Sequence, residues 1–407
     1  MLAQEVSVSE FLVATPDFYR YDWNPPATVR VDGRFVVMAW SDGAELRAFD
    51  LWLRENAVGA GGVDPLTREG LLDPADHDMA TRVGSAAVGE AGDVKVRFEP
   101  CGTETTFHPG WLRHVADRDH LATAWLPEPV AWTAATLRQP PTHDGPSVLN
   151  DPAARRVWLN DLVSFGISRV QGIAYDPDAL LELAAHIGAV RDTNFGPIWD
   201  VKADISLAGS SVTNSTANTS LRLGPHTDLP TRETPPGFQF LHCLVNETDG
   251  GESTMADGVA VVEALAGEHP EHYEALTTLR WVFFNRGPGI DHRWSGPMID
   301  LGAKGAPLTL RAFYPVRGFP DMDPDDMARA YDAMATFSAL AASDRFQLRY
   351  GFTAGDIVAF DNRRILHGRE AFTAGGARHL RGTYIDHDEV RSATRVANRH
   401  HRGDTRP

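Results

Sequence analysis

Three side chains in this sequence have the types and settings that a metal site needs: His226, Asp228 and His367. Residues two apart in a β-strand project from the same face, so His226 and Asp228 can offer an imidazole and a carboxylate to one ion while Thr227 points away. His367 stands in a distant segment, just after the strand-like run 356–360. Two histidines and one carboxylate occupy three of six octahedral positions, which leaves room for a bidentate 2-oxo acid and dioxygen. The three residues therefore predict a catalytic iron(II) site.

A basic side chain beyond His367 has the geometry to hold a dicarboxylate. Arg378 lies in the strand-like run 378–384, and its planar guanidinium can grip a carboxylate through two parallel hydrogen bonds. We therefore expect Arg378 to anchor 2-oxoglutarate. An isolated His-x-Asp triplet is weak evidence for a metal site. The presence of both His367 and Arg378 makes that evidence stronger. His242, in the alternating run 238–244, is expected to be a core histidine and not a fourth ligand.

The elements that must position these residues are expected after residue 150. A helix is predicted at 153–164 and another at 177–187, the second capped by Asp176. From about residue 205 onward strand-like segments dominate and helices interrupt them. The strands are expected at 165–170, 238–244, 281–284, 308–314, 356–360 and 378–384, and the later helices at 258–267 and 324–342. Strands that outnumber helices after a helical opening predict an α+β domain with a β-sandwich or barrel at its centre.

The N-terminal part has the pattern of a separate, smaller domain. Residues 28–115 hold short runs of β-branched and aromatic residues between turn signals. A Trp-Leu-Arg triplet recurs at 52–54 and 111–113, which favours a domain built from two similar strand-turn units. A proline-rich stretch without periodicity follows. We predict a small β-rich domain at 1–120, a linker at 121–150 and a catalytic domain at 151–407. Within the catalytic domain, the basic tail at 391–402 is expected to be solvated.

Composition narrows the class of protein. The chain has 407 residues, 43% of them hydrophobic, and a formal net charge of -17, which opposes binding to nucleic acid or to anionic membranes. Only Cys101 and Cys243 are present, which excludes a disulfide framework and a cysteine-based zinc cluster. The first residues lack the pattern of a signal peptide, and no window is apolar enough for a membrane span. We expect a cytoplasmic enzyme with a small-molecule substrate and no nucleic-acid or membrane partner.

Four segments resemble one branch of the taurine-dioxygenase-like (TauD-like) superfamily of Fe(II)/2-oxoglutarate oxygenases, the branch of γ-butyrobetaine hydroxylase and trimethyllysine hydroxylase. They are residues 224–230, 235–243, 250–258 and 360–369. The resemblance covers nearly the whole chain and includes residues 51–56 in the N-terminal part.

This resemblance implies a fold, a co-substrate and a reaction. The fold would be α+β: a double-stranded β-helix (jelly-roll) catalytic domain with flanking helices, preceded by a small β-rich N-terminal domain. Iron would be held by His226, Asp228 and His367, and 2-oxoglutarate by Arg378 with help from the hydroxyl of Ser253. Dioxygen and 2-oxoglutarate would be converted into succinate and carbon dioxide while an unactivated C–H bond of the substrate is hydroxylated. Members often dimerise, so a homodimer is also expected.

The N-terminal domain departs from the family pattern. Members of this branch commonly hold zinc there, with three cysteines after the motif at 51–56 and a histidine in the second strand-turn unit. The matching positions here are Ala57, Gly59, Gly62 and Thr103, none of which can ligate zinc. We therefore predict no structural zinc.

The substrate pocket departs from the pattern as well. Five positions match residues that contact substrate in this branch: Phe195, Trp199, Asn218, Tyr314 and Tyr384. Three of them keep the aromatic character of a cage that attracts trimethylammonium groups by cation–π interaction. Asn218 stands at the fourth cage position, however, and Tyr314 stands where the branch has an asparagine. The second substrate-binding arginine of taurine-specific members would fall on Gly382, so a sulfonate would lose its main partner.

These departures leave several hypotheses open. The leading one is a hydroxylase of a small zwitterionic or cationic substrate, which a trimethylammonium group would make betaine-like. A tailoring oxygenase of the same mechanism, acting on a natural product or a modified amino acid by hydroxylation, desaturation or ring formation, is a close rival. A non-catalytic β-helix binding protein and a zinc hydrolase are remoter alternatives, because Arg378 and Ser253 fit a 2-oxoglutarate site.

Overall fold

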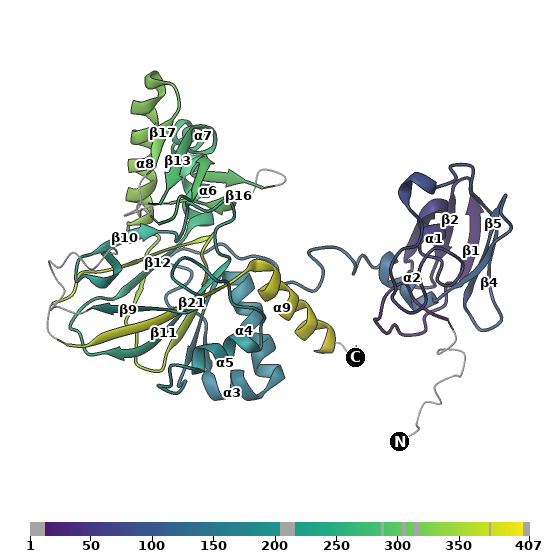
Figure 1. Ribbon diagram of the computed structural model, residues 1–407, viewed down its shortest axis with the longest axis horizontal. Helices are drawn as coiled ribbons and strands as arrows, with labels where there is room; N and C mark the ends of the chain where they lie inside the picture. Colours follow the sequence, from purple (N-terminus) through teal and green to yellow (C-terminus); the bar gives the residue numbers. More distant parts are fainter. Residues whose placement is uncertain are drawn as a thin grey trace. The chain divides into compact units, whose positions relative to one another are not determined.

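The structure, a computed structural model, describes residues 13–203, 216–285, 289–302, 307–312, 318–373 and 376–401. It divides into two compact units: the first comprises the chain up to Trp125 together with the C-terminal residues from Arg399, and the second spans Leu126–Asn398 (Figure 1). Each unit has a buried hydrophobic core of its own.

The N-terminal unit repeats one plan, in which three antiparallel strands are followed by a helix. The first copy consists of β1 (Thr28–Asp32), β2 (Phe35–Ala39), β3 (Glu45–Phe49) and α1 (Asp50–Glu55). The second copy consists of β4 (Arg82–Val88), β5 (Val94–Glu99), β6 (Glu104–Phe107) and α2 (Pro109–Ala116), with a short 3-10 helix, Pro74–Asp76, before it. Val94, Val96 and Phe98 of β5 point into the core, because alternate residues of a strand share one face.

The two Trp-Leu-Arg triplets lie in the helices of these copies. The rings of Trp52 in α1 and Trp111 in α2 are stacked, with centroids 5.1 Å apart and an interplanar angle of 10°. Leu53 and Leu112, which follow them, are fully buried. The predicted internal repeat is therefore confirmed, and its equivalent tryptophans pack against each other.

The loop after α1 occupies the positions at which zinc-binding relatives carry cysteines. The carbonyl oxygen of Ala57 accepts N–H bonds from Gly62 and Val63, both at 3.2 Å. A Cβ atom at position 62 would lie 2.4 Å from the carbonyl oxygen of Arg54, so this loop has no space for a cysteine there. The absence of structural zinc stays a prediction, which a metal analysis of the purified protein would test.

Two β-sheets form the centre of the C-terminal unit. The larger sheet has the order β7 (Thr142–Asp144), β8 (Ile167–Gln171), β19 (Ile357–Asp361), β11 (Phe238–Asn246), β21 (Arg378–Ile385) and β9 (Trp199–Ala203). The smaller sheet has the order β10 (Leu223–His226), β20 (Ile365–Arg369), β12 (Ser253–Asp257) and β18 (Leu348–Tyr350). All neighbouring strands are antiparallel except β7 and β8.

The two sheets pack face to face. Leu241 and Phe360 of the larger sheet share one buried cluster with Met255 and Ile365 of the smaller sheet. Phe240, one residue before Leu241, belongs instead to the cluster on the opposite face, as the two-residue period of a strand requires. Side chains from the inner faces of both sheets therefore meet in the space between them.

Helices cover the outer face of the larger sheet (Figure 1). They are α4 (Pro152–Phe165), α5 (Ala179–Ala185) and α9 (His387–His401), with α3 (Gly145–Asn150) before α4. The α4 helix begins where the side chain of Asp151 accepts the N–H of Ala153 and ends at Gly166, whose φ of 69° stops the helix. The helix predicted at 153–164 is thereby confirmed.

The segment between β12 and β18 forms a third layer with its own buried cluster. Its helices are α6 (Gly258–Glu268), α7 (Pro270–Thr278) and α8 (Met327–Ala341), the last preceded by a 3-10 turn, Pro324–Asp326. Its strands are β13 (Arg280–Phe284), β14 (Arg293–Gly296), β15 (Ile299–Leu301), β16 (Pro307–Leu310) and β17 (Phe319–Asp321). Figure 1 shows this layer next to β10 and β12, the strands that lead to the candidate site.

Two segments predicted to lack structure are folded in this unit. Within the predicted linker, the Trp132 side chain is 2% exposed and donates its indole N–H to the carbonyl of Phe165 at 2.8 Å, and residues 142–150 form β7 and α3. The prediction of a solvated basic tail was wrong, because α9 continues to His401 and buries Val390 and Thr394 fully. Two buried positions four residues apart are enough to dock an otherwise charged helix.

The helix predicted at 177–187 begins later than expected. Asp176 accepts hydrogen bonds from the backbone N–H groups of Asp178 and Ala179 and holds the chain in a turn first. The α5 helix therefore starts at Ala179.

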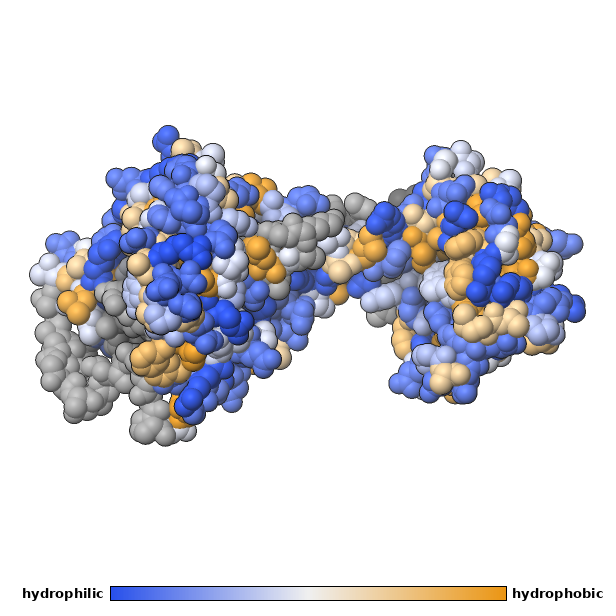
Figure 2. Space-filling view, turned by 90° about the horizontal axis from the view of Figure 1, so that it is seen from above, coloured by the Kyte–Doolittle hydropathy of each residue, from blue (hydrophilic) through white to orange (hydrophobic). Residues whose placement is uncertain are grey.

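The surface of the described chain is mainly polar. Figure 2 shows hydrophilic residues over most of the visible face of the C-terminal unit, with hydrophobic residues scattered among them. In the part of the chain that the structure describes, no helix combines the length and the apolar character needed to cross a membrane.

Candidate active site

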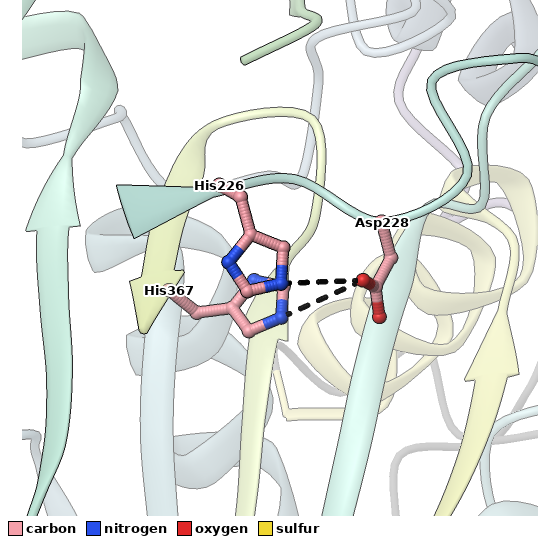
Figure 3. Close-up of side chains that lie close together, drawn as sticks. All are labelled: His226, Asp228 and His367. Atoms are coloured by element: carbon pink, nitrogen blue, oxygen red, sulfur yellow. Dashed lines mark ion pairs between the residues drawn. The ribbon is translucent and has the colours of Figure 1, made fainter. Parts of the chain in front are cut away.

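His226, Asp228 and His367 come together between the two sheets. His226 ends β10 and is the register partner of His367 in β20, and their ring centroids lie 4.1 Å apart. The Oδ1 atom of Asp228 lies 3.6 Å from Nε2 of His226 and 3.7 Å from Nε2 of His367. Figure 3 shows both imidazoles and the carboxylate pointing toward one another. The structure thus brings together the three residues that the sequence singled out, although Asp228 lies just beyond the strand and not within it.

His226 presents its Nε2 atom to the carboxylate of Asp228. Its Nδ1 lies 2.9 Å from the carbonyl oxygen of Gly224, an oxygen that can only accept, so Nδ1 is the donor in this hydrogen bond and Nε2 faces the cluster. Burial, and to a lesser degree the neighbouring His226, lowers the pKa of His367 to about 3. His367 is therefore neutral at pH 7, as a metal ligand must be.

Asp228 is held so that one carboxylate oxygen faces the histidines. Its other oxygen, Oδ2, accepts a hydrogen bond from the hydroxyl of Tyr384 at 2.8 Å. Burial and the nearby Asp228 raise the pKa of Tyr384 well above its usual value, which keeps this hydroxyl protonated as the donor. Tyr384 was predicted to line the substrate pocket, and the structure places it against a predicted metal ligand as well.

The donor set fits a small divalent cation. The ligand atoms of the three residues all lie within 4.8 Å of one another, and both histidines are buried. Two imidazoles and one carboxylate match the preference of iron(II), and one face of the ion would remain open. His242, which was expected to be a core histidine, is fully buried and is not among these donors.

A second group of potential ligands in the described residues is less suitable. His269, Glu271 and His272 lie at the start of α7 and are only partly buried or exposed. The N-terminus of a helix carries a partial positive charge, which opposes cation binding. The buried cluster is therefore the candidate metal centre.

Arg378 has the properties of an anion site without its anion. Its side chain is on the inner face of β21 and the residue is 4% exposed, yet its guanidinium has no hydrogen bond or ion pair in the described part of the chain. The guanidinium lies 5.9 Å from the ring centroid of Phe372. Burial lowers its pKa from the usual value. Because a buried unpaired charge is costly, this arrangement favours a bound carboxylate.

Arg369 is equally buried, but both of its terminal nitrogens have hydrogen-bond partners, and its Nε is the one guanidinium nitrogen without a partner in the described residues. Arg369 is 4% exposed and donates to the carbonyl oxygens of Ala217, Thr219 and Leu221. Its guanidinium lies 4.8 Å from the ring centroid of Phe372, which is the same ring that Arg378 approaches. Two neighbouring arginines therefore differ in kind: Arg369 fixes a loop, and Arg378 is available to a ligand.

Ser253 occupies the inner face of the smaller sheet at the same end as these arginines. It is the register partner of Arg369 in the pairing of β12 with β20 and is 5% exposed. Met255, two residues on, is the partner of His367. Ser253 is thus two strand positions from Met255, the partner of His367. A 2-oxoglutarate molecule that lay between the metal site and Arg378 would be within reach of the Ser253 hydroxyl.

The predicted substrate residues are only partly gathered. The rings of Trp199 and Tyr384 lie 5.5 Å apart at 37°, and Phe195 is 49% exposed. Trp199 is the register partner of Gly382, and a Cβ at that glycine would lie 2.4 Å from the indole ring. The missing side chain at position 382 therefore makes room for Trp199.

Two further predicted substrate residues contribute little to this picture. The side-chain oxygen of Asn218 accepts the backbone N–H of Lys202 at 3.3 Å, which ties the 3-10 turn Thr216–Asn218 to β9. Tyr314 lies outside the described residues.

Sequence reasoning missed the residues that hold the segment after Asp228. Arg311 is 2% exposed and donates to the carbonyl oxygens of Pro230, Arg232 and Glu233, with its guanidinium 3.5 Å from the ring centroid of Trp294. Thr227 donates its N–H to the carbonyl of Ala312 at 2.7 Å. Asn362, within a motif that the sequence did single out, bonds both backbone groups of Asp228. These partners are mostly backbone carbonyls, which leave no trace in a sequence pattern.

Comparison with known proteins places the chain in a family. The model of the taurine catabolism dioxygenase TauD, TfdA family matches residues 129–384. A γ-butyrobetaine dioxygenase of Pseudomonas sp. (strain AK-1) is 36% identical over 368 residues, which are 89% of this chain and 94% of that protein. Dioxygenase str8 of Strobilurus tenacellus is 30% identical, covering 83% of this chain and 82% of its own length. The mitochondrial trimethyllysine dioxygenase of Gallus gallus is 28% identical, with 86% and 84% covered.

The chain belongs to the TauD/TfdA family, as the resemblance in its motifs predicted. It is a 2-oxoglutarate-dependent dioxygenase with an α+β fold, and it uses Fe(II), 2-oxoglutarate and dioxygen.

Proposed function

We propose that this dioxygenase hydroxylates an unactivated C–H bond of a small substrate that carries a trimethylammonium group. Iron(II) is held by His226, Asp228 and His367, and 2-oxoglutarate by Arg378 with the help of Ser253. The observation that carries the proposal is the buried cluster of two histidines and one carboxylate in the same sheet sandwich as a buried guanidinium that has no partner among the described residues. The similarity to a γ-butyrobetaine dioxygenase and to trimethyllysine dioxygenases supports the choice of substrate class.

The residues of this chain would prepare the reaction by binding and orientation. Bound iron(II) would let dioxygen, the oxidant, react with 2-oxoglutarate and substrate, so that one atom of dioxygen enters succinate with loss of carbon dioxide and the other enters the hydroxylated product. Arg378 neutralises the distal carboxylate of 2-oxoglutarate through paired hydrogen bonds. Tyr384 holds Oδ2 of Asp228, which directs Oδ1 toward the histidines. The low pKa of His367 means that no proton competes with the metal at neutral pH.

The aromatic pair next to the cluster is the proposed binding place of the cationic end of the substrate. Trp199 and Tyr384 form adjoining walls, and each well-placed ring contributes about 0.5 to 2 kcal/mol of cation–π attraction. Phe195, which is 49% exposed, is a third wall in this proposal. Gly382 leaves no positive charge beside the cation.

The substrate class is tested by measuring succinate release with a panel of compounds. We expect γ-butyrobetaine, trimethyllysine or a related betaine to stimulate conversion of 2-oxoglutarate, with one hydroxylated product formed per succinate. Stimulation only by amino acids or natural-product intermediates without a quaternary ammonium group would replace this proposal by the tailoring oxygenase. Conversion by no compound, together with failure to bind Fe(II), would refute both.

The remaining sequence-based predictions belong to the same proposal. We infer that the two facing sheets form a double-stranded β-helix, preceded by a β-rich N-terminal domain without zinc. We also infer a homodimer in the cytoplasm, a compartment in which the free Cys101 and Cys243 remain reduced. Sedimentation analysis of the full chain tests the oligomeric state, and a monomer at working concentration would contradict it.

A further inference from the structure

Asn362 is a buried amide that connects the second predicted iron ligand to the third. It lies in the turn between β19 and β20 and is fully buried. Its Oδ1 atom accepts the backbone N–H of Asp228 at 2.6 Å, and its Nδ2 atom donates to the backbone carbonyl of Asp228 at 3.0 Å. The same Nδ2 atom lies 3.4 Å from the carbonyl oxygen of Pro236. One side chain thus pairs both backbone groups of one residue, as a neighbouring strand would.

This pairing is needed because Asp228 lies beyond the end of β10. Its backbone has no ladder partner, and the next residue, Leu229, has a φ of 51°, at which the chain turns out of the strand direction. The carboxylate can face the histidines only if this backbone is fixed. Asn362 supplies the fixation from the turn that connects β19 in the larger sheet to β20 in the smaller sheet, and β20 carries His367.

We propose that Asn362 is a positioning residue of the iron site. It holds the backbone of Asp228 to the turn that leads into β20, the strand of His367, and so sets the distance between the carboxylate and the two imidazoles before any metal binds. Tyr384 completes the arrangement by fixing the outer carboxylate oxygen. This inference rests on the proposed function, because it assigns Asn362 a role only if the cluster binds metal.

The test uses the full chain, stripped of metal, titrated calorimetrically with Ni(II), which binds imidazole sites more tightly than Fe(II) and does not oxidise. We expect Asn362→Ala to raise the Kd for Ni(II) about tenfold or more, the usual effect of losing a residue that orients a metal ligand. Asn160→Ala is the matched control, because it also removes three side-chain hydrogen bonds, one to the carbonyl of Arg156 and two exchanged with the side chain of Asn398. Its Kd should equal that of the wild type.

A double-mutant cycle separates positioning from general loosening of the fold. If Asn362 acts through Asp228, then Asn362→Ala should change the Kd less than twofold when Asp228→Ala is already present. An equal loss of affinity in both backgrounds, or no loss in the single variant, overturns the inference. Should the alanine variant fail to fold, Asn362→Ser keeps an acceptor for the Asp228 N–H and should show a smaller loss of the same kind. Absence of Ni(II) binding by the wild-type chain would refute the iron site itself.

Discussion

Arg378 and Arg369 are neighbouring buried arginines that should respond in opposite ways to the same substitution. In the absence of 2-oxoglutarate, Arg378→Met removes a charge that has no partner in the described chain, so the free energy of unfolding should stay the same or rise. Arg369→Met removes the three hydrogen bonds that the guanidinium donates to the carbonyl oxygens of Ala217, Thr219 and Leu221. At about 1 kcal/mol for each hydrogen bond, this second variant should lose about 3 kcal/mol of stability.

The affinity for 2-oxoglutarate should depend strongly on Arg378. Two charge-assisted hydrogen bonds to a carboxylate contribute about 1.5 to 3 kcal/mol each, so their loss amounts to at least about 3 kcal/mol. This corresponds to an increase of the Kd for 2-oxoglutarate by about a hundredfold or more. The Kd is measured by calorimetric titration of 2-oxoglutarate into the Ni(II)-loaded protein, and stability by urea unfolding of the protein without co-substrate.

Either of two results would refute this reasoning about Arg378. A variant that binds 2-oxoglutarate as tightly as the wild type would show that the co-substrate is held elsewhere. A variant that is destabilised as much as Arg369→Met would show that the guanidinium has a structural partner and is not a vacant anion site.

Three further predictions concern the surroundings of the site. Burial lowers the pKa of His242 from 6.5 to about 4, so below pH 6.5 the unfolded chain binds a proton that the folded chain does not. The free energy of unfolding should therefore fall as the pH drops from 7 to 5. Urea unfolding of His242→Leu should show a fall that is smaller by about 2 kcal/mol. Gly382→Ala should displace the Trp199 ring and lower the free energy of unfolding by about 1 to 3 kcal/mol. It should also raise the KM of a trimethylammonium substrate, and an unchanged KM would argue against Trp199 as a cage wall. Tyr384→Phe should raise the Kd for Ni(II) and the KM of the substrate together, because its hydroxyl holds Asp228 and its ring adjoins Trp199; a change in only one of the two constants would assign Tyr384 a single role.

Sequence reasoning identified the residues whose side-chain type alone indicates their chemistry. Two histidines, an aspartate and an arginine in strand contexts indicated a metal and a dicarboxylate, and the structure brings the first three together at distances of 3.6 and 3.7 Å. The internal repeat was equally visible, since Trp52 and Trp111 recur in the same short motif and stack on each other. Such features need only a residue type and a spacing.

The parts that sequence reasoning missed depend on partners that are not encoded locally. Asn362 and Arg311 act on backbone groups, and any residue at positions 228, 230, 232 or 233 would present the same carbonyl or N–H. The α9 helix was missed for a related reason: its docking depends on Val390 and Thr394, which are buried only by elements distant in the chain. Tertiary context, and not local propensity, decides such features.

The central claim is that His226, Asp228 and His367 hold Fe(II) with 2-oxoglutarate bound beside it. Anaerobic titration of the metal-free protein with Fe(II) and then 2-oxoglutarate tests it most directly, because a 2-oxo acid chelated to Fe(II) gives a visible charge-transfer band. We expect the band to saturate at one equivalent of Fe(II) in the wild type and to be missing in His226→Ala. In Arg378→Met the band should require about a hundredfold more 2-oxoglutarate. A band of full intensity in His226→Ala, or none in the wild type, would contradict it.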